Sequence, residues 1–287
     1  MAPSFLRKVQ TWLPRRWRAA PPIEQTLWQP LCDSLPFVQA LSLADRERLR
    51  LLSAHFLQEK EFHGAHGLHI TDAMALSIAA QACLPLLHMC LPDGSKPRQP
   101  AQLLAWYDDF VGIVVQPGTA IAQREITDTT GVVHRYREEL AGEAMDGGPV
   151  MLSWDEVSRA GELAASGRNV VIHEFAHKFD MHDTGHGERP DGAPPLPPGF
   201  CGLSDAAAAR GHWQRTMQAS YERFREAVSL AERFGGEWPW LDDYAATHPA
   251  EFFAVCCEAY CVQRERFGQE LPELLPLFDG LFRAAEH

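Results

Sequence analysis

The sequence lacks any apolar run of about 18 residues or more, the length that a membrane-spanning helix requires. Its N-terminus also lacks an apolar segment with a small-residue cleavage site, so we do not expect a secretory signal. The seven cysteines are odd in number and irregularly spaced, which argues against a disulfide framework. We therefore expect a cytoplasmic protein with reduced thiols and no membrane span. Cys257 and Cys261 are expected to be small core residues rather than metal ligands.

Basic residues are scarce outside the first twenty positions. The chain has 26 lysines and arginines against 38 aspartates and glutamates, a net charge of -12. Five basic and no acidic residues fall in the first 20 positions, so the remainder has 21 minus 38, or -17. Because an acidic body offers no basic face to a phosphate backbone, we expect no nucleic-acid partner.

The order of local patterns indicates an α+β protein with a mixed first half and a helical second half. Ser42 and Asp45 resemble a capping signal for a helix that ends near Lys60. The other predicted helices cover residues 72–88, kinked or ended by Pro85, 206–234, 248–264 and 271–285. The predicted strands cover residues 67–71, 110–116, 131–136 and 149–154.

We predict that residues 1–24 form a basic, flexible leader and that residues 25–287 form a single domain. The glycine- and proline-rich segment Asp183–Ser204 reads as a loop. It would join two subregions of that domain, at about 25–182 and 205–287.

The segment Val170–His177 contains an H-E-x-x-H motif that directly follows an apolar run. On a helix, residues four apart lie on one face, so His173 and His177 can point at one metal ion. Glu174 then lies about 100° further round, within reach of a water at that ion. Buried polar side chains cost free energy unless they are paired or bind a metal. The motif therefore predicts a helix, capped by Ser166 or Asn169, that provides half of a zinc site for peptide hydrolysis.

A catalytic zinc ion usually has three protein ligands, so a third must lie elsewhere in the chain. Asp183 is ten residues after His173, but Asp180 occupies the position where that arrangement expects glycine, and we discount it. Further candidates are His182, His186 and His212.

Glutamates on a later helix are the other solution for the third ligand. Glu251 follows Pro249, which suits the first helical position, and Glu258 lies two turns on along the same face. Spacing alone leaves both open as ligands. Glu258 and Asp180 are also candidates for a carboxylate that orients a ligand histidine.

Three sequence blocks resemble the Mlc titration factor A family of zinc metallopeptidases, which are gluzincins related in structure to the catalytic domains of lethal-factor toxins. The resemblance extends from about residue 25 to near the C-terminus. The blocks are Gly148-Pro-Val-Met-Leu-Ser-Trp154, Asn169-Val-Val-Ile-His-Glu-Phe-Ala-His-Lys-Phe-Asp180, and Asp243-Tyr-Ala-Ala246 followed by Pro249-Ala-Glu-Phe-Phe-Ala-Val255.

This resemblance implies a zincin-like fold and a role for each matching residue. It implies that His173, His177 and Glu251 bind one zinc ion and that Glu174 is the general base. It further implies that Tyr244 assists the transition state.

We therefore predict a zinc-dependent peptidase that acts on a peptide or protein substrate, and the resemblance suggests aminopeptidase activity. The strand at 149–154 is a candidate sheet edge for pairing with an extended peptide. The alternative is a non-enzymatic, zinc-containing regulator that sequesters a transcriptional repressor, as the family name suggests. Structural zinc sites are closed by four ligands, whereas only three are evident here, which favours the enzyme.

Overall fold

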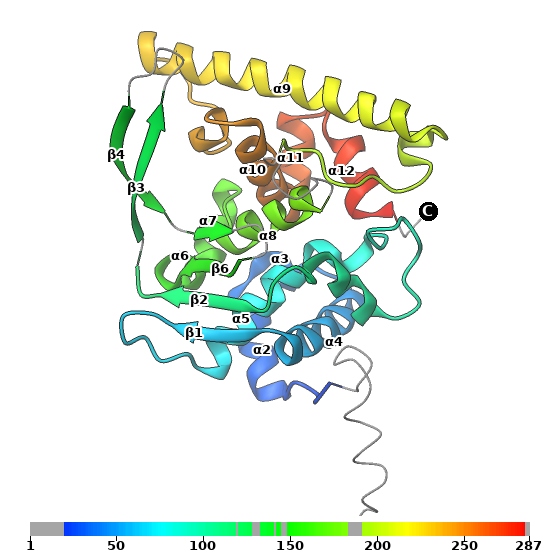
Figure 1. Ribbon diagram of the computed structural model, residues 1–287. Helices are drawn as coiled ribbons and strands as arrows, with labels where there is room; N and C mark the ends of the chain where they lie inside the picture. The colour runs from blue at the N-terminus through cyan, green and yellow to red at the C-terminus, as the bar shows by residue number, and fades with distance from the viewer. Residues whose placement is uncertain are drawn as a thin grey trace, which may run out of the picture.

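The structure is a computed structural model that describes residues 20–118, 120–127, 133–140, 142–144, 148–182 and 191–284. Figure 1 shows helix α9 (Ala206–Phe234) along one side of the molecule and helices α2 (Gln25–Ser34) and α5 (Asp72–Cys83) toward the other. Helices α8 (Val170–Met181) and α10 (Pro249–Val262) lie between them. The predicted α+β architecture with a helical second half is confirmed.

The N-terminal helices begin and end where their capping residues indicate. Ser42 caps α4 (Leu43–Glu59), and its hydroxyl accepts the Asp45 backbone N–H at 3.1 Å. Helix α5 ends before Pro85, whose ring cannot continue an α-helix, and the chain continues as a 3₁₀ turn. The remaining elements of this region are α3 (Pro36–Gln39), η2 (Pro85–His88) and η3 (Pro100–Tyr107).

A four-stranded sheet has the order β1-β2-β6-β5. Strands β1 (Glu61–Gly64), β2 (Gly112–Gln116) and β6 (Val150–Ser153) are parallel, and β5 (Gly142–Ala144) is antiparallel to β6. In register, Ile113 lies opposite both Phe62 and Val150, which aligns apolar side chains on the face toward the core. Strands β3 (Ala120–Thr127) and β4 (Val133–Leu140) form a separate antiparallel pair.

The prediction that the strand at 149–154 forms a sheet edge is wrong. Strand β6 pairs with β2 on one side and with β5 on the other, so its backbone groups are already used. The outer position on this side of the sheet belongs to β5, which also lies next to α8. Sequence patterns missed β5 because three residues show no detectable periodicity.

The prediction of a strand at 67–71 is also wrong, because the strand lies a few residues earlier, at β1. His66 and Gly67 have φ values of 52° and 79°, which turn the chain where an extended strand was expected. Gly64 ends β1, and a Cβ there would lie only 1.8 Å from the carbonyl oxygen of Leu68. Only glycine permits this close approach of two backbone segments.

The second half contains helices and 3₁₀ turns. The predicted helix at 206–234 matches α9, but the predicted helix at 271–285 begins only at Leu275, because residues 271–274 form a non-helical turn. Only residues up to 284 of that prediction are described. The elements not yet given are α6 (Trp154–Ser158), α7 (Ala160–Leu163), η4 (Ala164–Ser166), η5 (Phe200–Gly202), η6 (Asp243–Ala246), α11 (Arg264–Glu270) and α12 (Leu275–Phe282).

Aromatic packing holds α8 against the N-terminal elements. The fully buried Phe175 ring lies 5.7 Å from Phe56, 4.8 Å from Tyr107 and 5.8 Å from Phe110, measured between ring centroids. Such aromatic clusters bury large apolar areas in defined geometries. The face of α8 that bears Phe175 is therefore rigidly supported by the N-terminal elements.

One hydrophobic cluster includes buried residues from Ile23 to Phe282 and so spans both predicted subregions. Ile23 is buried and its carbonyl accepts a hydrogen bond from Arg50, so the end of the predicted leader is held against the domain. Residues 1–19 of the predicted leader lie outside the described residues. No helix in the described ranges is long and apolar enough to cross a membrane.

Lys60 ties the start of β1 to the end of η3. Its buried ammonium donates to the backbone carbonyls of Tyr107 and Phe110 and lies 4.0 Å from the Phe110 ring centroid. Burial lowers the Lys60 pKa from 10.5 to about 8.

We expect the stability of the wild type, relative to a Lys60→Met variant, to increase as pH rises above 8. The folded state releases the Lys60 proton near pH 8, whereas the unfolded chain keeps it until about pH 10.4. The stability difference should therefore grow by up to roughly 1.4 kcal/mol per pH unit in this window. Urea unfolding at pH 7, 8, 9 and 10 measures it, with exposed Lys96→Met as the control. A pH-independent difference for Lys60→Met would contradict the prediction.

Candidate metal centre

Helix α8 begins at Asn169, one of the two predicted caps. The Asn169 side-chain oxygen accepts the Ile172 backbone N–H at 3.0 Å. The helix then places His173 and His177 on one face, with imidazole centroids 5.0 Å apart. Both side chains are about one-eighth exposed, at 12%. This face of α8 points toward α10.

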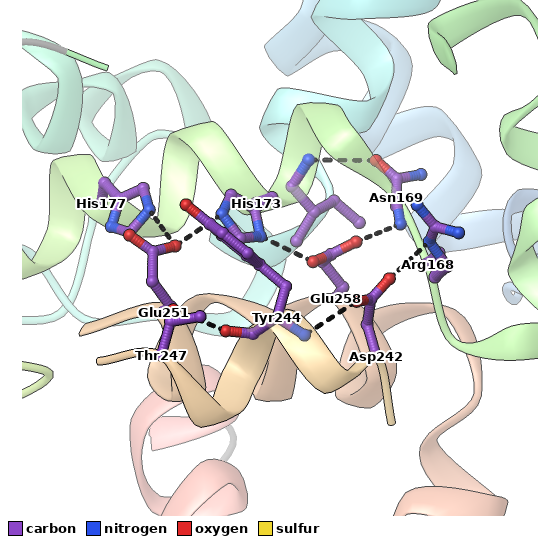
Figure 2. Close-up of polar contacts among 10 residues, drawn as sticks. Arg168, Asn169, His173, His177, Asp242, Tyr244, Thr247, Glu251 and Glu258 are labelled. Atoms are coloured by element: carbon purple, nitrogen blue, oxygen red, sulfur yellow. Dashed lines mark hydrogen bonds and ion pairs between the residues drawn. The ribbon is translucent and has the colours of Figure 1, made fainter. Parts of the chain in front are cut away.

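Helix α10 brings a carboxylate to the same two imidazoles. Pro249 occupies the first turn of the helix, and Glu251 follows within that turn. Glu251 Oε2 lies 3.1 Å from His173 Nε2 and 3.3 Å from His177 Nε2. Figure 2 shows the Glu251 carboxylate directed at both imidazoles. Among the residues that the structure describes, these three form the one group of His, Cys, Asp or Glu whose ligand atoms converge, all within 4.8 Å.

Glu258 lies behind His173 rather than in this group. Its Oε1 atom is 2.7 Å from His173 Nδ1, and its other oxygen accepts the backbone N–H of Asn169. Glu251 and Glu258 are two helical turns apart on one face, so one helix supplies both carboxylates. The bond at Nδ1 orients the imidazole and leaves Nε2 directed at Glu251, the arrangement that metal-binding histidines usually show.

Charge and burial act in opposite directions on the groups of this cluster. Burial disfavours ionised Glu251, but hydrogen bonds from His173 and His177 outweigh it and lower the Glu251 pKa. Burial likewise disfavours charged His173, but hydrogen bonds to Glu251 and Glu258 raise its pKa well above the usual range. Because an imidazole must be neutral to bind a metal ion, metal binding at His173 would release a proton.

Glu174 is the second buried carboxyl group beside the histidines. Its side chain is only 4% exposed. Burial raises the Glu174 pKa from 4.5 to about 7, although the neighbouring His173 and His177 pull it down. A carboxyl group with a pKa near neutrality can both accept and release a proton at physiological pH.

Tyr244 reaches the cluster from η6, the turn that precedes α10. Asp242 caps this turn and accepts the Tyr244 backbone N–H at 3.0 Å. The Tyr244 ring centroid is 6.1 Å from that of His173, and Figure 2 shows the ring extending toward the two histidines. The site thus combines α8, η6 and α10.

Several other predicted candidates do not join the cluster. The Asp180 carboxylate accepts the backbone N–H groups of Gly192 and Ala193, at 2.8 and 3.0 Å, so it anchors the loop after α8. His182 Nε2 lies 2.8 Å from the Trp106 carbonyl oxygen, and His212 lies on α9 outside the group. Asp183 and His186 fall outside the described residues.

A groove with a volume of about 630 Å³ lies between α9, the loop at 191–193 and the first turn of α10. It begins at His248 and Pro249, within one helical turn of Glu251. Apolar side chains form its walls and polar ones its exposed rim. The walls include Trp213, Met217, Tyr221 and Phe252, and the rim includes Asp191, Gln214, Arg215 and Gln218.

The sequence analysis missed three residues that support the site. Gln81 accepts a hydrogen bond from the Asn169 side chain at 2.8 Å, and Arg168 pairs with Asp242 at 3.0 Å. Gln81 interrupts the apolar run of residues 78–84, and this was a usable signal in the sequence. A polar side chain at such a position is buried and needs a hydrogen-bond partner. Nothing in the sequence indicated that Arg168 and Asp242, far apart along the chain, would meet.

The chain is similar to proteins of a known metallopeptidase family. A model of the family described as glucose-regulated metallo-peptidase M90 matches residues 9–283. The protein "Mlc titration factor A" from Klebsiella pneumoniae is 31% identical over 250 residues, covering 87% of this chain and 83% of the relative. The protein of the same name from Salmonella gallinarum is 30% identical over 269 residues, covering 93% and 90%.

We expect Glu258→Gln to weaken metal binding, measured with Zn²⁺ as the probe ion, by about 10- to 100-fold, the usual effect of losing a carboxylate that orients a ligand histidine. The amide is neutral and no longer favours the oriented, electron-rich imidazole of His173. Competition with a chromogenic chelator measures the affinity, and Glu162→Gln, an exposed site with 79% side-chain exposure, is the control. Equal affinities for both variants would exclude a role for Glu258.

Proposed function

We propose that this chain, which belongs to the glucose-regulated metallo-peptidase M90 family, is a zinc-dependent enzyme that hydrolyses peptide bonds. The observation that supports this most directly is the convergence of His173, His177 and Glu251. Glu174 beside them adds a buried carboxyl group with a pKa near 7. A purely structural site has no use for such a group.

The donor set fits zinc. Two imidazole nitrogens and one carboxylate oxygen are the ligands of many catalytic zinc sites, which keep a fourth position open. His173, His177 and Glu251 would hold the ion, and the low Glu251 pKa keeps its carboxylate ionised. Thiolates, which many structural zinc sites use, are absent from this group.

A bound zinc ion would supply Lewis acidity that lowers the pKa of water and polarises a carbonyl group. Glu174 would accept the proton of the attacking water and pass it to the leaving amine. Tyr244 would donate a hydrogen bond from its hydroxyl to the developing oxyanion, a contribution of about 3 kcal/mol. Glu258 would keep the His173 imidazole oriented throughout.

We further propose that the groove between α9 and α10 receives apolar side chains of a peptide substrate. Its walls are aromatic and aliphatic, and two of the residues that line it, His248 and Pro249, precede Glu251 by three and two positions in the chain. The family resemblance suggests an aminopeptidase. Comparing hydrolysis of free and N-acetylated amino-acid anilides tests this, since an aminopeptidase requires the free α-amine.

A second candidate function is binding to a transcriptional repressor, because relatives at about 30% identity have the name "Mlc titration factor A". All seven cysteines are free thiols, which fits the cytoplasm where repressors act. A pull-down with the Mlc repressor, using wild type and Glu174→Gln, tests this role apart from catalysis. Equal retention of the repressor by both proteins would show that binding does not require catalysis.

We expect Glu174→Gln to reduce hydrolysis of a peptide library at least about 100-fold, because the amide cannot accept the proton of the attacking water. The variant should keep its zinc, since Glu174 is outside the ligand group. Mass spectrometry of the products and atomic absorption of the protein measure both. Undiminished turnover by this variant would refute the mechanism.

We expect Glu251→Ala to lower zinc stoichiometry well below one per chain after dialysis, because two imidazoles alone bind zinc weakly. Glu265→Ala, which removes an exposed glutamate from α11, is the control for the loss of one surface charge. Full zinc content in Glu251→Ala would move the third ligand to another residue.

A further inference from the structure

We infer that Arg168 and Asp242 are positioning residues whose ion pair holds Tyr244 beside the candidate metal ligands. The effect of this ion pair on catalysis depends on the proposed peptidase function, whereas the contacts themselves do not. Arg168 Nε lies 3.0 Å from Asp242 Oδ2, as Figure 2 shows. The ion pair joins two segments that are far apart along the chain.

The two oxygens of Asp242 have different partners. Oδ2 pairs with Arg168, and Oδ1 accepts the backbone N–H of Tyr244 at 3.0 Å. The carboxylate thus connects the arginine directly to the backbone of the tyrosine. The 3₁₀ turn η6 has only four residues, and the Asp242 carboxylate restrains its start through the Tyr244 backbone N–H.

Arg168 is placed to transmit the position of α8. It directly precedes Asn169, the cap of that helix, whose backbone N–H donates to Glu258. Glu258 in turn holds His173. Arg168 holds Tyr244 through Asp242, and Asn169 holds the proposed zinc ligand His173 through Glu258. Because Arg168 and Asn169 are consecutive, these contacts restrain the distance between Tyr244 and His173.

A close backbone contact strengthens this connection. Gly167 has a φ of 79°, and a Cβ at this position would lie 2.8 Å from the Trp240 ring. Trp240 is two residues before Asp242, and Arg266 lies above its ring at 4.6 Å from the centroid. The segment that leads to Tyr244 is thus packed against the residue that precedes Arg168.

The inference predicts a specific pattern of kinetic effects. Arg168→Ala should lower kcat roughly 10-fold with little change in KM, because displaced catalytic groups cost rate rather than ground-state binding. Arg168→Lys should restore part of the loss. Asp242→Asn, which keeps an oxygen for the Tyr244 N–H but loses the charge, should resemble Arg168→Ala.

A double-mutant cycle separates positioning from a general structural effect. In a Tyr244→Phe background, Arg168→Ala should cause no further loss of kcat, because the hydroxyl that it positions is already absent. Arg159→Ala is the matched control, since Arg159 and Arg168 are equally exposed at 48% and both form ion pairs. Independent, additive losses would overturn the inference.

Hydrogen–deuterium exchange of the full chain gives a readout that does not depend on activity. Exchange in residues 238–247 should be faster in Arg168→Ala than in wild type or Arg159→Ala, while α10 stays protected. Unchanged exchange in this segment would refute the positioning role. Faster exchange in a protein whose wild type hydrolyses no peptide would support the positioning role and refute the proposed function instead.

Discussion

The buried carboxylate of Glu258 is the interaction on which the site depends. It joins α10 to α8 at two points, the Asn169 backbone N–H and His173 Nδ1. A buried, ionisable carboxyl group is costly unless it is fully hydrogen-bonded, and burial raises its pKa accordingly. The two bonds offset that cost, and in doing so they hold together the two helices that supply the three candidate ligands.

The surrounding core makes this joint rigid. Phe175, two residues after His173, packs against aromatic rings of the N-terminal helices and turns. Gln81 on α5 holds the Asn169 side chain from a third direction. The polar face of α8 therefore cannot shift without disturbing its apolar face, which is how a packed core keeps ligand atoms at fixed distances.

The sequence analysis succeeded where the signal was local. The cap at Ser42, the break at Pro85, the full extent of α9 and the histidine face of α8 all follow from neighbouring residues. It failed where the decisive contact was distant. Pairing with β2 places β1 at Glu61–Gly64 rather than at the predicted 67–71, and the pairing of β6 with β5 leaves no free sheet edge at the predicted 149–154.

By itself, the sequence determined the class of the fold, the pair of histidines and the neighbouring carboxyl group, because helix periodicity places residues four apart on one face. Spacing left both Glu251 and Glu258 open as the third ligand, and resemblance to a family favoured Glu251. Only the tertiary structure decided their geometry. It placed Glu251 against both Nε2 atoms and Glu258 against Nδ1, because the angle and depth at which α10 packs on α8 are properties of the whole core.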